Sequence, residues 1–177
     1  MGSFYSSRKP TNFFAALVEL IKEGKVEKEN VRIQFWSASK SYLVPSFLKS
    51  IVYHENSISE KESVLQMQQS DVLLLVHPTN EAKGVFTGKL FEYLGSCRPV
   101  LALVDPDDVA AQLIQQCNAG WVAPDENINE IKSAIMSAYE FWEQKKQYKP
   151  DFTLLHSLHR KDQVGKLDKE ILTPLLA

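Results

Sequence analysis

Two short apolar runs, residues 72–76 (VLLLV) and 100–104 (VLALV), most constrain what this chain can fold into. Neither run alternates with polar residues, which is typical of parallel strands whose two faces are both buried. Parallel neighbours need a crossover connection, usually a helix, and Leu90, Phe91 and Leu94 recur between the runs at helical spacing. The region therefore predicts a strand, a helix and a second, parallel strand.

Extended and helical patterns alternate through most of the chain. Further strands are predicted at residues 31–36, 51–54 and 119–124, and a strand fragment begins at Gly2. Helices are predicted at residues 10–24, 45–49, 60–69, 109–114 and 127–146. This order is typical of an α/β protein. We predict a Rossmann-like, doubly wound parallel sheet of about six strands with helices on both faces.

The composition indicates an ordinary globular chain. Its 177 residues are 44% hydrophobic and 24% charged, with a formal net charge of −2. We expect no nucleic-acid partner, because basic residues are not in excess. Cys97 and Cys117 lack metal-site spacing, which favours reduced thiols and a cytoplasmic location. No apolar stretch is long enough for a membrane span, while peripheral association with a membrane surface stays open.

The helix between the two apolar runs carries the main candidate site. Thr87 is a suitable N-cap, which places Gly88 and Lys89 in the first helical turn. Backbone N–H groups, the positive end of the helix dipole and the lysine charge together favour a phosphate there. Glu92 lies on the same face, and its carboxylate can accept hydrogen bonds from a neighbouring diol. A phosphate beside a diol indicates a nucleotide.

The run G-K-L-F-E-Y-L-G-S-C-R-P-V-L-A at residues 88–102 resembles the donor-binding signature of retaining GT-B glycosyltransferases. That family carries a motif of one Glu, seven further residues and a second Glu. Weaker matches at residues 2–10 and 120–124 resemble the opening loop and the last strand of the same domain. The resemblance covers nearly the whole chain and implies the C-terminal, donor-binding half of a GT-B fold.

The resemblance also implies roles for individual residues. Gly88 and Lys89 would lie beside the diphosphate of a nucleotide-sugar donor, and Arg8 or Lys9 would contact it from the opposite side. Glu92 would bind the ribose hydroxyls. The donor is a substrate, so the resemblance implies no cofactor and no metal ion.

The first Glu of the motif is missing from this chain. Gly84 occupies its position, and Glu81 is near but out of register. In the family this Glu contacts the transferred sugar, so Gly84 leaves the sugar class open. Other candidate sugar contacts follow the strand at residues 72–76, where doubly wound sheets place their ligands: His77, Thr79, Asn80 and Glu81. The same four residues are equally typical of a solvated turn.

Candidate contacts to the nucleobase come from the resemblance by position alone. They are Tyr53, His54 and Ile58, in and after the strand at residues 51–54. Taken by itself, His54 is more typical of a histidine in a surface loop.

Two metal-like patterns are interpreted differently. Asp105 and Asp107 nominally match an Asp-x-Asp metal motif, but they fit turn and N-cap chemistry better. His156 and His159 are three residues apart with no evident third ligand, which favours a solvated helix face. No G-x-G-x-x-G follows a predicted strand, which argues against a dinucleotide site.

Two segments are predicted. Residues 1–149 form the nucleotide-sugar-binding domain, and residues 150–177 form a helical segment that packs on this domain or on a partner domain. The resemblance implies a hexosyltransferase-like enzyme whose acceptor-binding domain or subunit is not in this chain, so that the chain alone would be inactive. The alternatives are a non-catalytic nucleotide-binding or regulatory module and the donor subunit of a two-subunit transferase.

Overall fold

The computed structural model describes residues 8–37, 42–77, 83–84 and 86–172. The strands are β1 (Ile33–Trp36), β2 (Val52–Glu55), β3 (Leu73–Val76), β4 (Val100–Leu103) and β5 (Gly120–Ala123). The longer helices are α1 (Thr11–Lys22), α2 (Glu60–Gln69), α3 (Gly88–Gly95), α4 (Val109–Gln116), α5 (Ile128–Glu143), α6 (Phe152–Ser157) and α7 (Arg160–Leu167). Short helical turns are η1 (Lys28–Asn30), η2 (Ser46–Leu48) and η3 (Asp168–Leu172).

The strands form two parallel sheets, one of β1 and β2 and one in the order β3-β4-β5. The α/β class and the parallel pairing agree with the prediction. The predicted single sheet of about six strands is not seen among the described residues, which give five strands in two sheets, with no pairing between β1 and β3 in that part of the chain. The strand fragment expected at Gly2 lies outside the described residues.

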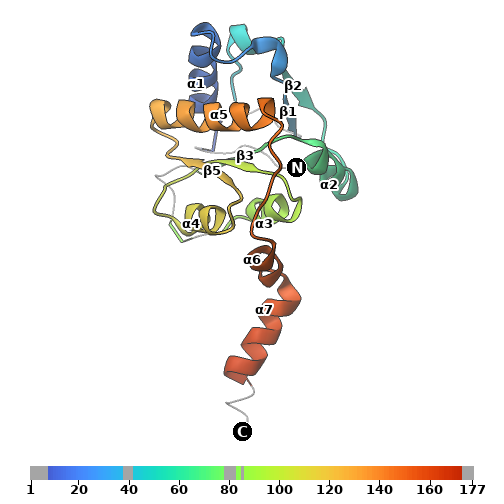
Figure 1. Ribbon diagram of the computed structural model, residues 1–177. Coiled ribbons are helices and arrows are strands. Elements are labelled where there is room, and N and C mark those ends of the chain that lie inside the picture. Colours follow the sequence, from blue (N-terminus) through green and yellow to red (C-terminus); the bar gives the residue numbers. More distant parts are fainter. Residues whose placement is uncertain (1–7, 38–41, 78–82, 85, 173–177) are drawn as a thin grey trace.

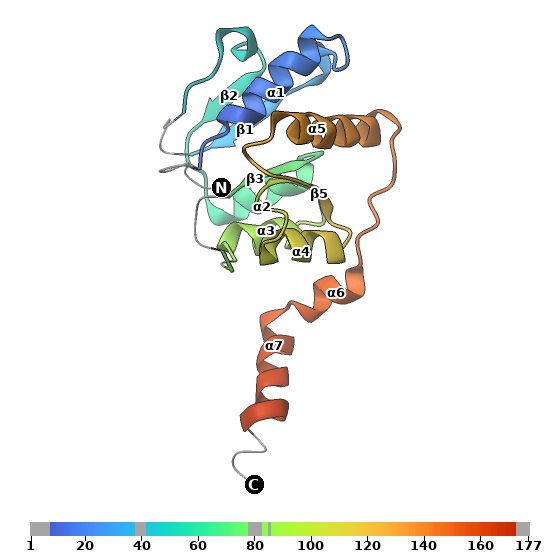
Figure 2. The same cartoon turned by 90° about the vertical axis from the view of Figure 1, so that its left-hand side faces the viewer.

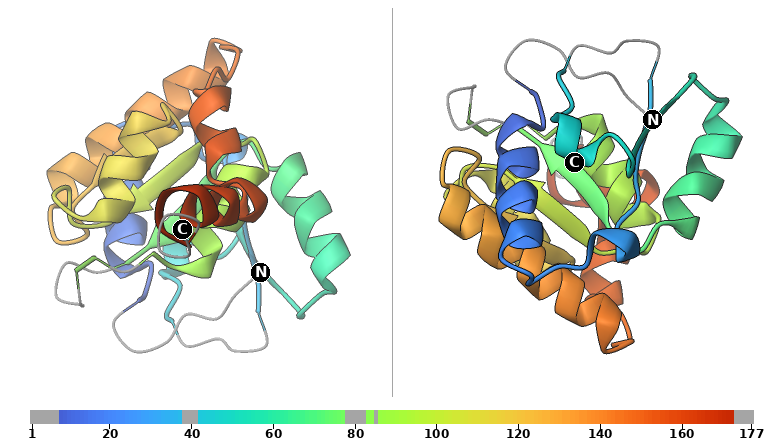
Figure 3. Two further views of the ribbon diagram at one scale, coloured as in Figure 1. Left: turned by 90° about the horizontal axis from the view of Figure 1, so that it is seen from below. Right: turned by 90° about the horizontal axis from the view of Figure 1, so that it is seen from above.

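Helices cover both faces of the three-stranded sheet (Figures 1 and 2). α1 and α5 pack against each other on one face, and α5 contacts β4 and β5. On the opposite face α3 contacts β3 and α4 contacts β5. The views from below and above in Figure 3 show the same two helical layers. This layering buries both faces of β3 and β4, as their uniformly apolar sequences require.

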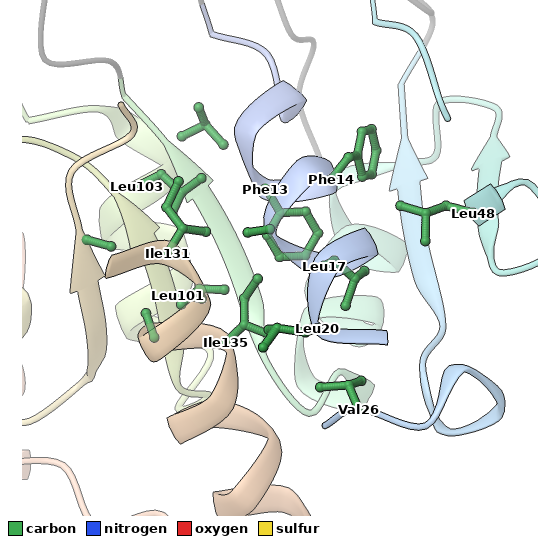
Figure 4. Close-up of a cluster of buried hydrophobic side chains, with 14 of the residues drawn as sticks. Phe13, Phe14, Leu17, Leu20, Val26, Leu48, Leu101, Leu103, Ile131 and Ile135 are labelled. Carbon is green, nitrogen blue, oxygen red and sulfur yellow. The ribbon is translucent and has the colours of Figure 1, made fainter. Parts of the chain in front are cut away.

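One hydrophobic core lies under α1 and α5 (Figure 4). The apolar stripe predicted on the first helix supplies Phe14, Leu17 and Leu20, which are almost fully buried. Ile131 comes from α5 and Leu103 from β4. These side chains fix the position of the chain that enters α1, and with it the position of Arg8.

A second core lies under α3 and α4. Leu90 and Leu94 of α3 pack there with Val100 of β4 and Ile114 of α4. The thiol of Cys117 is also buried here, and burial raises its pKa. Because Leu90 and Leu94 anchor α3 on the sheet, the first turn of α3 is held at a fixed place.

Side chains cap two further helices. The hydroxyl of Ser59 accepts from the backbone N–H of Glu62, and the Glu62 carboxylate accepts from the backbone N–H of Ser59, which forms a capping box at the start of α2. The side chain of Asn127 caps α5 through the amides of Asn129 and Glu130.

The C-terminal segment leaves the body of the molecule after α5 (Figure 2). α6 stays close, because Leu154, Leu155 and Leu158 pack against the second core and the amide of Asp151 bonds the carbonyl of Cys117 at 2.8 Å. α7 projects away, with Val164 63% exposed. Of the helices described, none combines the length and the apolar character needed to cross a membrane.

Candidate functional site

The site is built on the first turn of α3. Thr87 is the N-cap, as predicted, and its hydroxyl accepts a hydrogen bond from the amide of Leu90 at 3.3 Å. Among the described residues, a Cβ atom added at Gly88 would meet no atom within 4 Å apart from its chain neighbours and the backbone of α3, so a ligand can approach the turn closely at this position. The backbone N–H groups of the turn and the positive end of the helix dipole therefore face an accessible region.

A cavity of about 890 Å³ adjoins this turn. Thr87, Gly88, Lys89 and Glu92 line it from α3, and Arg8 lines it from the segment that enters α1. The structure thus places Arg8, one of the two cations predicted to contact the diphosphate, beside the residues of α3 that were predicted to bind the phosphate and the ribose. These residues are about 80 positions away from Arg8 in the sequence. Lys9 is exposed and does not line this cavity.

Lys89 and Glu92 form an ion pair, in which the Lys89 ammonium group donates to Glu92 Oε2. Their side chains are 31% and 46% exposed. Pairs this exposed contribute little to stability. Both charges can therefore turn toward a ligand at small cost, the ammonium group toward a phosphate and the carboxylate toward hydroxyl groups.

His77 and Asp108 form a buried polar pair that does not line the cavity. His77 directly follows β3 and is only 3% exposed, and its Nε2 lies 3.9 Å from Asp108 Oδ2. Asp108 Oδ1 accepts from the backbone N–H of Gly84 at 2.8 Å and of Val109 at 2.7 Å. One carboxylate thus caps α4 and holds the chain before α3, which keeps the approach to the first turn in place.

Gly84 has a backbone φ of +79°. Residues with a Cβ rarely adopt this conformation, so the backbone here suits glycine and disfavours the glutamate that the resembled motif has at this position. Of the other predicted sugar contacts, Thr79, Asn80 and Glu81 lie outside the described residues.

The predicted base contacts lie away from the cavity. Tyr53 is 39% exposed on β2, with the guanidinium of Arg32 over its ring. The His54 ring bonds the Tyr42 hydroxyl at 2.9 Å and the carbonyl of Ser37 at 3.0 Å, which is a structural role. Neither Tyr53, His54 nor Ile58 lines the cavity.

Sequence reasoning missed Trp36, which ends β1 and lines the cavity. The signal was present in the sequence, because Trp36 is the last residue of a predicted parallel strand and ligands bind beyond such ends. An aromatic ring at this place offers a stacking surface for a base.

The aspartates after β4 have the predicted turn and capping roles. Asp105 accepts from the amide of Asp107 at 2.9 Å and pairs with Lys83. The Lys83 hydrogen bond holds the pKa of Asp105 below its usual value, and the same contact raises the pKa of Lys83. This ion pair fixes the start of the segment that leads to α3.

Within the described ranges no three histidine, cysteine, aspartate or glutamate side chains are grouped as metal ligands would be. The rings of His156 and His159 stack with their centroids 6.0 Å apart.

Comparison with known proteins adds no assignment, since no protein-family model matches this chain and no curated protein does.

Proposed function

We propose that this chain is the nucleotide-sugar-binding domain of a glycosyltransferase, with the donor bound at the first turn of α3. The observation that carries the proposal is that Arg8, Gly88, Lys89 and Glu92 line one cavity. We also infer a Rossmann-like arrangement, because parallel strands alternate with helices that cover both faces of the sheet. The resemblance at residues 88–102 supports the class of ligand.

The diphosphate would be held from two sides. On one side are the N–H groups of the α3 first turn and the ammonium group of Lys89, and on the other is the guanidinium of Arg8. Glu92 lies one turn further along α3, where its carboxylate can accept from the ribose hydroxyls. In this arrangement the Lys89 to Glu92 pair separates, and each partner gains a contact to the nucleotide.

The reaction would transfer a sugar from a nucleoside diphosphate to an acceptor hydroxyl. Negative charge develops on the departing diphosphate in the transition state, and the cations and helix amides around it stabilise that charge. The acceptor hydroxyl would be held by a second domain or subunit that closes over the cavity. Glu92 would orient the donor and would take no part as an acid or a base.

One observation favours a second candidate, a non-catalytic nucleotide-binding or regulatory module. Gly84 supplies no carboxylate to a transferred sugar, and its φ of +79° strains any other residue there. A module of this kind would keep the diphosphate and ribose contacts and lack sugar recognition.

Calorimetric titration of the full chain with UDP, GDP and ADP tests the proposal. We expect one of the three to bind at a single site, because a base is selected by its own contacts. A folded sample that binds none of them would contradict the proposal. Titration with the matching nucleotide sugar then separates the two candidates, since tighter binding than the plain nucleotide supports the transferase and equal binding supports the module.

A further inference from the structure

A second cavity, of about 480 Å³, lies at the amino ends of the strands. Asp71 lines it two residues before β3, and Arg98 lines it two residues before β4. The first turn of α3 lies instead beyond the carboxyl end of β3. The length of β3, roughly 13 Å, therefore separates this cavity from that turn. Trp142 lines both this cavity and the larger one, so the two adjoin.

Three cations line the second cavity, which we call the basic cavity. Arg98 belongs to the segment between α3 and β4, and Lys145 and Lys146 follow the end of α5. Within the described part of the chain these three form no ion pair and no side-chain hydrogen bond, whereas Lys83 and Lys132 pair with acids. Like charges gathered at one place repel each other, and an anion among them replaces that repulsion with attraction. The basic cavity therefore favours an anionic group.

The backbone holds two of these cations in unfavourable conformations. Lys145 has a φ of +49°, and Cys97, the residue before Arg98, has a φ of +56°. The amides of Lys145 and Lys146 donate to carbonyls in the last turn of α5 at 2.9 and 3.1 Å, a helix ending that usually has glycine at the position of Lys145. Strained backbone of this kind is concentrated at ligand sites. A site that uses the lysine charge gives a reason for lysine at a position that glycine would occupy with less strain.

The other polar side chains of the basic cavity suit hydroxyl groups. The carboxylates of Asp71 and Glu143 line it and can accept hydrogen bonds. Among the described residues, neither carboxylate pairs with one of the three cations. Asn30 adds a side-chain amide whose nitrogen already donates to Glu27 at 2.9 Å. A ligand that carries hydroxyl groups as well as an anionic group would satisfy both sets of side chains.

Aromatic side chains complete the lining. Trp142 is 38% exposed, and its ring packs against that of Tyr139, with the centroids 5.6 Å apart. The flat indole offers a surface for the apolar face of a sugar ring. Tyr148 lies in the connection that descends from α5 toward α6 in Figure 2. Burial raises the pKa of Tyr148 to about 12, so its hydroxyl stays protonated at neutral pH and can donate to a ligand.

We propose that the basic cavity binds a sugar phosphate, with the phosphate among the three cations and the sugar ring against Trp142. The sugar hydroxyls would donate to the carboxylates of Asp71 and Glu143. A simple anion would leave these carboxylates without a partner, and a neutral sugar would leave the cations without one. The volume of about 480 Å³ is in the range of small-molecule sites. This proposal does not rest on the nucleotide proposal, which concerns the first turn of α3.

Calorimetric titration of the full chain with glucose 6-phosphate, glucose and inorganic phosphate tests the class of ligand. We expect glucose 6-phosphate to bind at least about tenfold more tightly than either of the others, because it alone uses both the cations and the hydroxyl acceptors. A folded sample that does not bind glucose 6-phosphate would overturn the proposal. So would one that binds it no more tightly than inorganic phosphate.

Variants test the place of binding. We expect Arg98→Ala to weaken glucose 6-phosphate binding by about 10- to 150-fold, because a hydrogen bond to a charged group is lost. The midpoint of thermal unfolding should not change, since Arg98 is exposed. Lys149→Ala is the matched control, because Lys149 is an exposed cation close to the same segment that does not line the basic cavity.

Two results from these variants would overturn the proposal. The first is an equal loss of affinity in the Arg98 and Lys149 variants, which would show a general effect of charge. The second is binding that survives Arg98→Ala and is lost in Lys89→Ala, which would place the sugar phosphate at the first turn of α3.

Discussion

Replacement of Lys89 by alanine is expected to weaken nucleoside diphosphate binding by about 10- to 150-fold. A hydrogen bond to a charged group contributes about 1.5 to 3 kcal/mol, and each 1.4 kcal/mol is a tenfold change in affinity. The fold should be unaffected, because the ion pair that Lys89 forms with Glu92 is exposed and such pairs contribute little to stability. Calorimetry on the variant and the parent chain, with thermal unfolding as a check on folding, measures both quantities.

Glu92→Ala separates binding of the ribose from binding of the diphosphate when inorganic diphosphate is titrated in parallel with the nucleotide. We expect this variant to lose affinity for the nucleoside diphosphate, because the ribose contacts are gone. Its affinity for inorganic diphosphate should stay equal or rise, because a negative charge beside the anion is removed. Lys89→Ala should lose affinity for both ligands. Lys61→Ala, which removes an exposed cation of α2, is the matched control and should change neither. Equal losses in the Lys89 and Lys61 variants would refute the assigned site.

Gly120→Ala is expected to destabilise the fold by roughly 3 kcal/mol or more. Gly120 lies opposite Val100 in the pairing of β4 with β5, and a Cβ atom there would be 1.9 Å from the backbone oxygen of Val100. Backbone atoms of a central strand cannot move aside without breaking the ladder. Gly120 also has a positive φ of 147°, which adds conformational strain for any other residue. Denaturant unfolding of the two chains measures the difference.

Gly24→Ala separates the clash from the conformational strain. Gly24 also has a positive φ, 67°, but a Cβ atom there would meet no atom of the described residues within 4 Å apart from its chain neighbours. We expect Gly24→Ala to lower the free energy of unfolding by roughly 1 kcal/mol, which is the cost of placing alanine in the left-handed conformation. If Gly120→Ala lowered the free energy of unfolding by no more than Gly24→Ala does, that result would contradict the close approach of Gly120 to the backbone of Val100.

Local features of the fold were predictable from the sequence. The cap at Thr87 depends on residues within three positions of each other, and it forms as predicted. The apolar runs at residues 72–76 and 100–104 predicted β3 and β4 and their parallel pairing, because both faces of each had to be buried.

The contacts between segments that are far apart in the sequence were harder to predict. The sequence pattern identified the strands but not their full order, so the division of the five described strands into two sheets was not predicted. His54 was placed at the site by position, while its actual partner Tyr42 comes from a segment with no recognisable pattern. From the sequence, Arg8 and Lys9 were equally good candidates for the contact to the diphosphate. The structure distinguishes them, because only Arg8 lines the cavity.

The central claim, that the first turn of α3 binds a nucleoside diphosphate, is tested most directly by amide chemical shifts. The full chain, labelled with nitrogen-15, would be titrated with whichever of UDP, GDP and ADP binds. We predict the largest shift changes at the amides of Gly88 and Lys89, with a further change at Arg8, because these groups surround the bound diphosphate. Saturable binding that leaves Gly88 and Lys89 unshifted and moves amides elsewhere would contradict the claim.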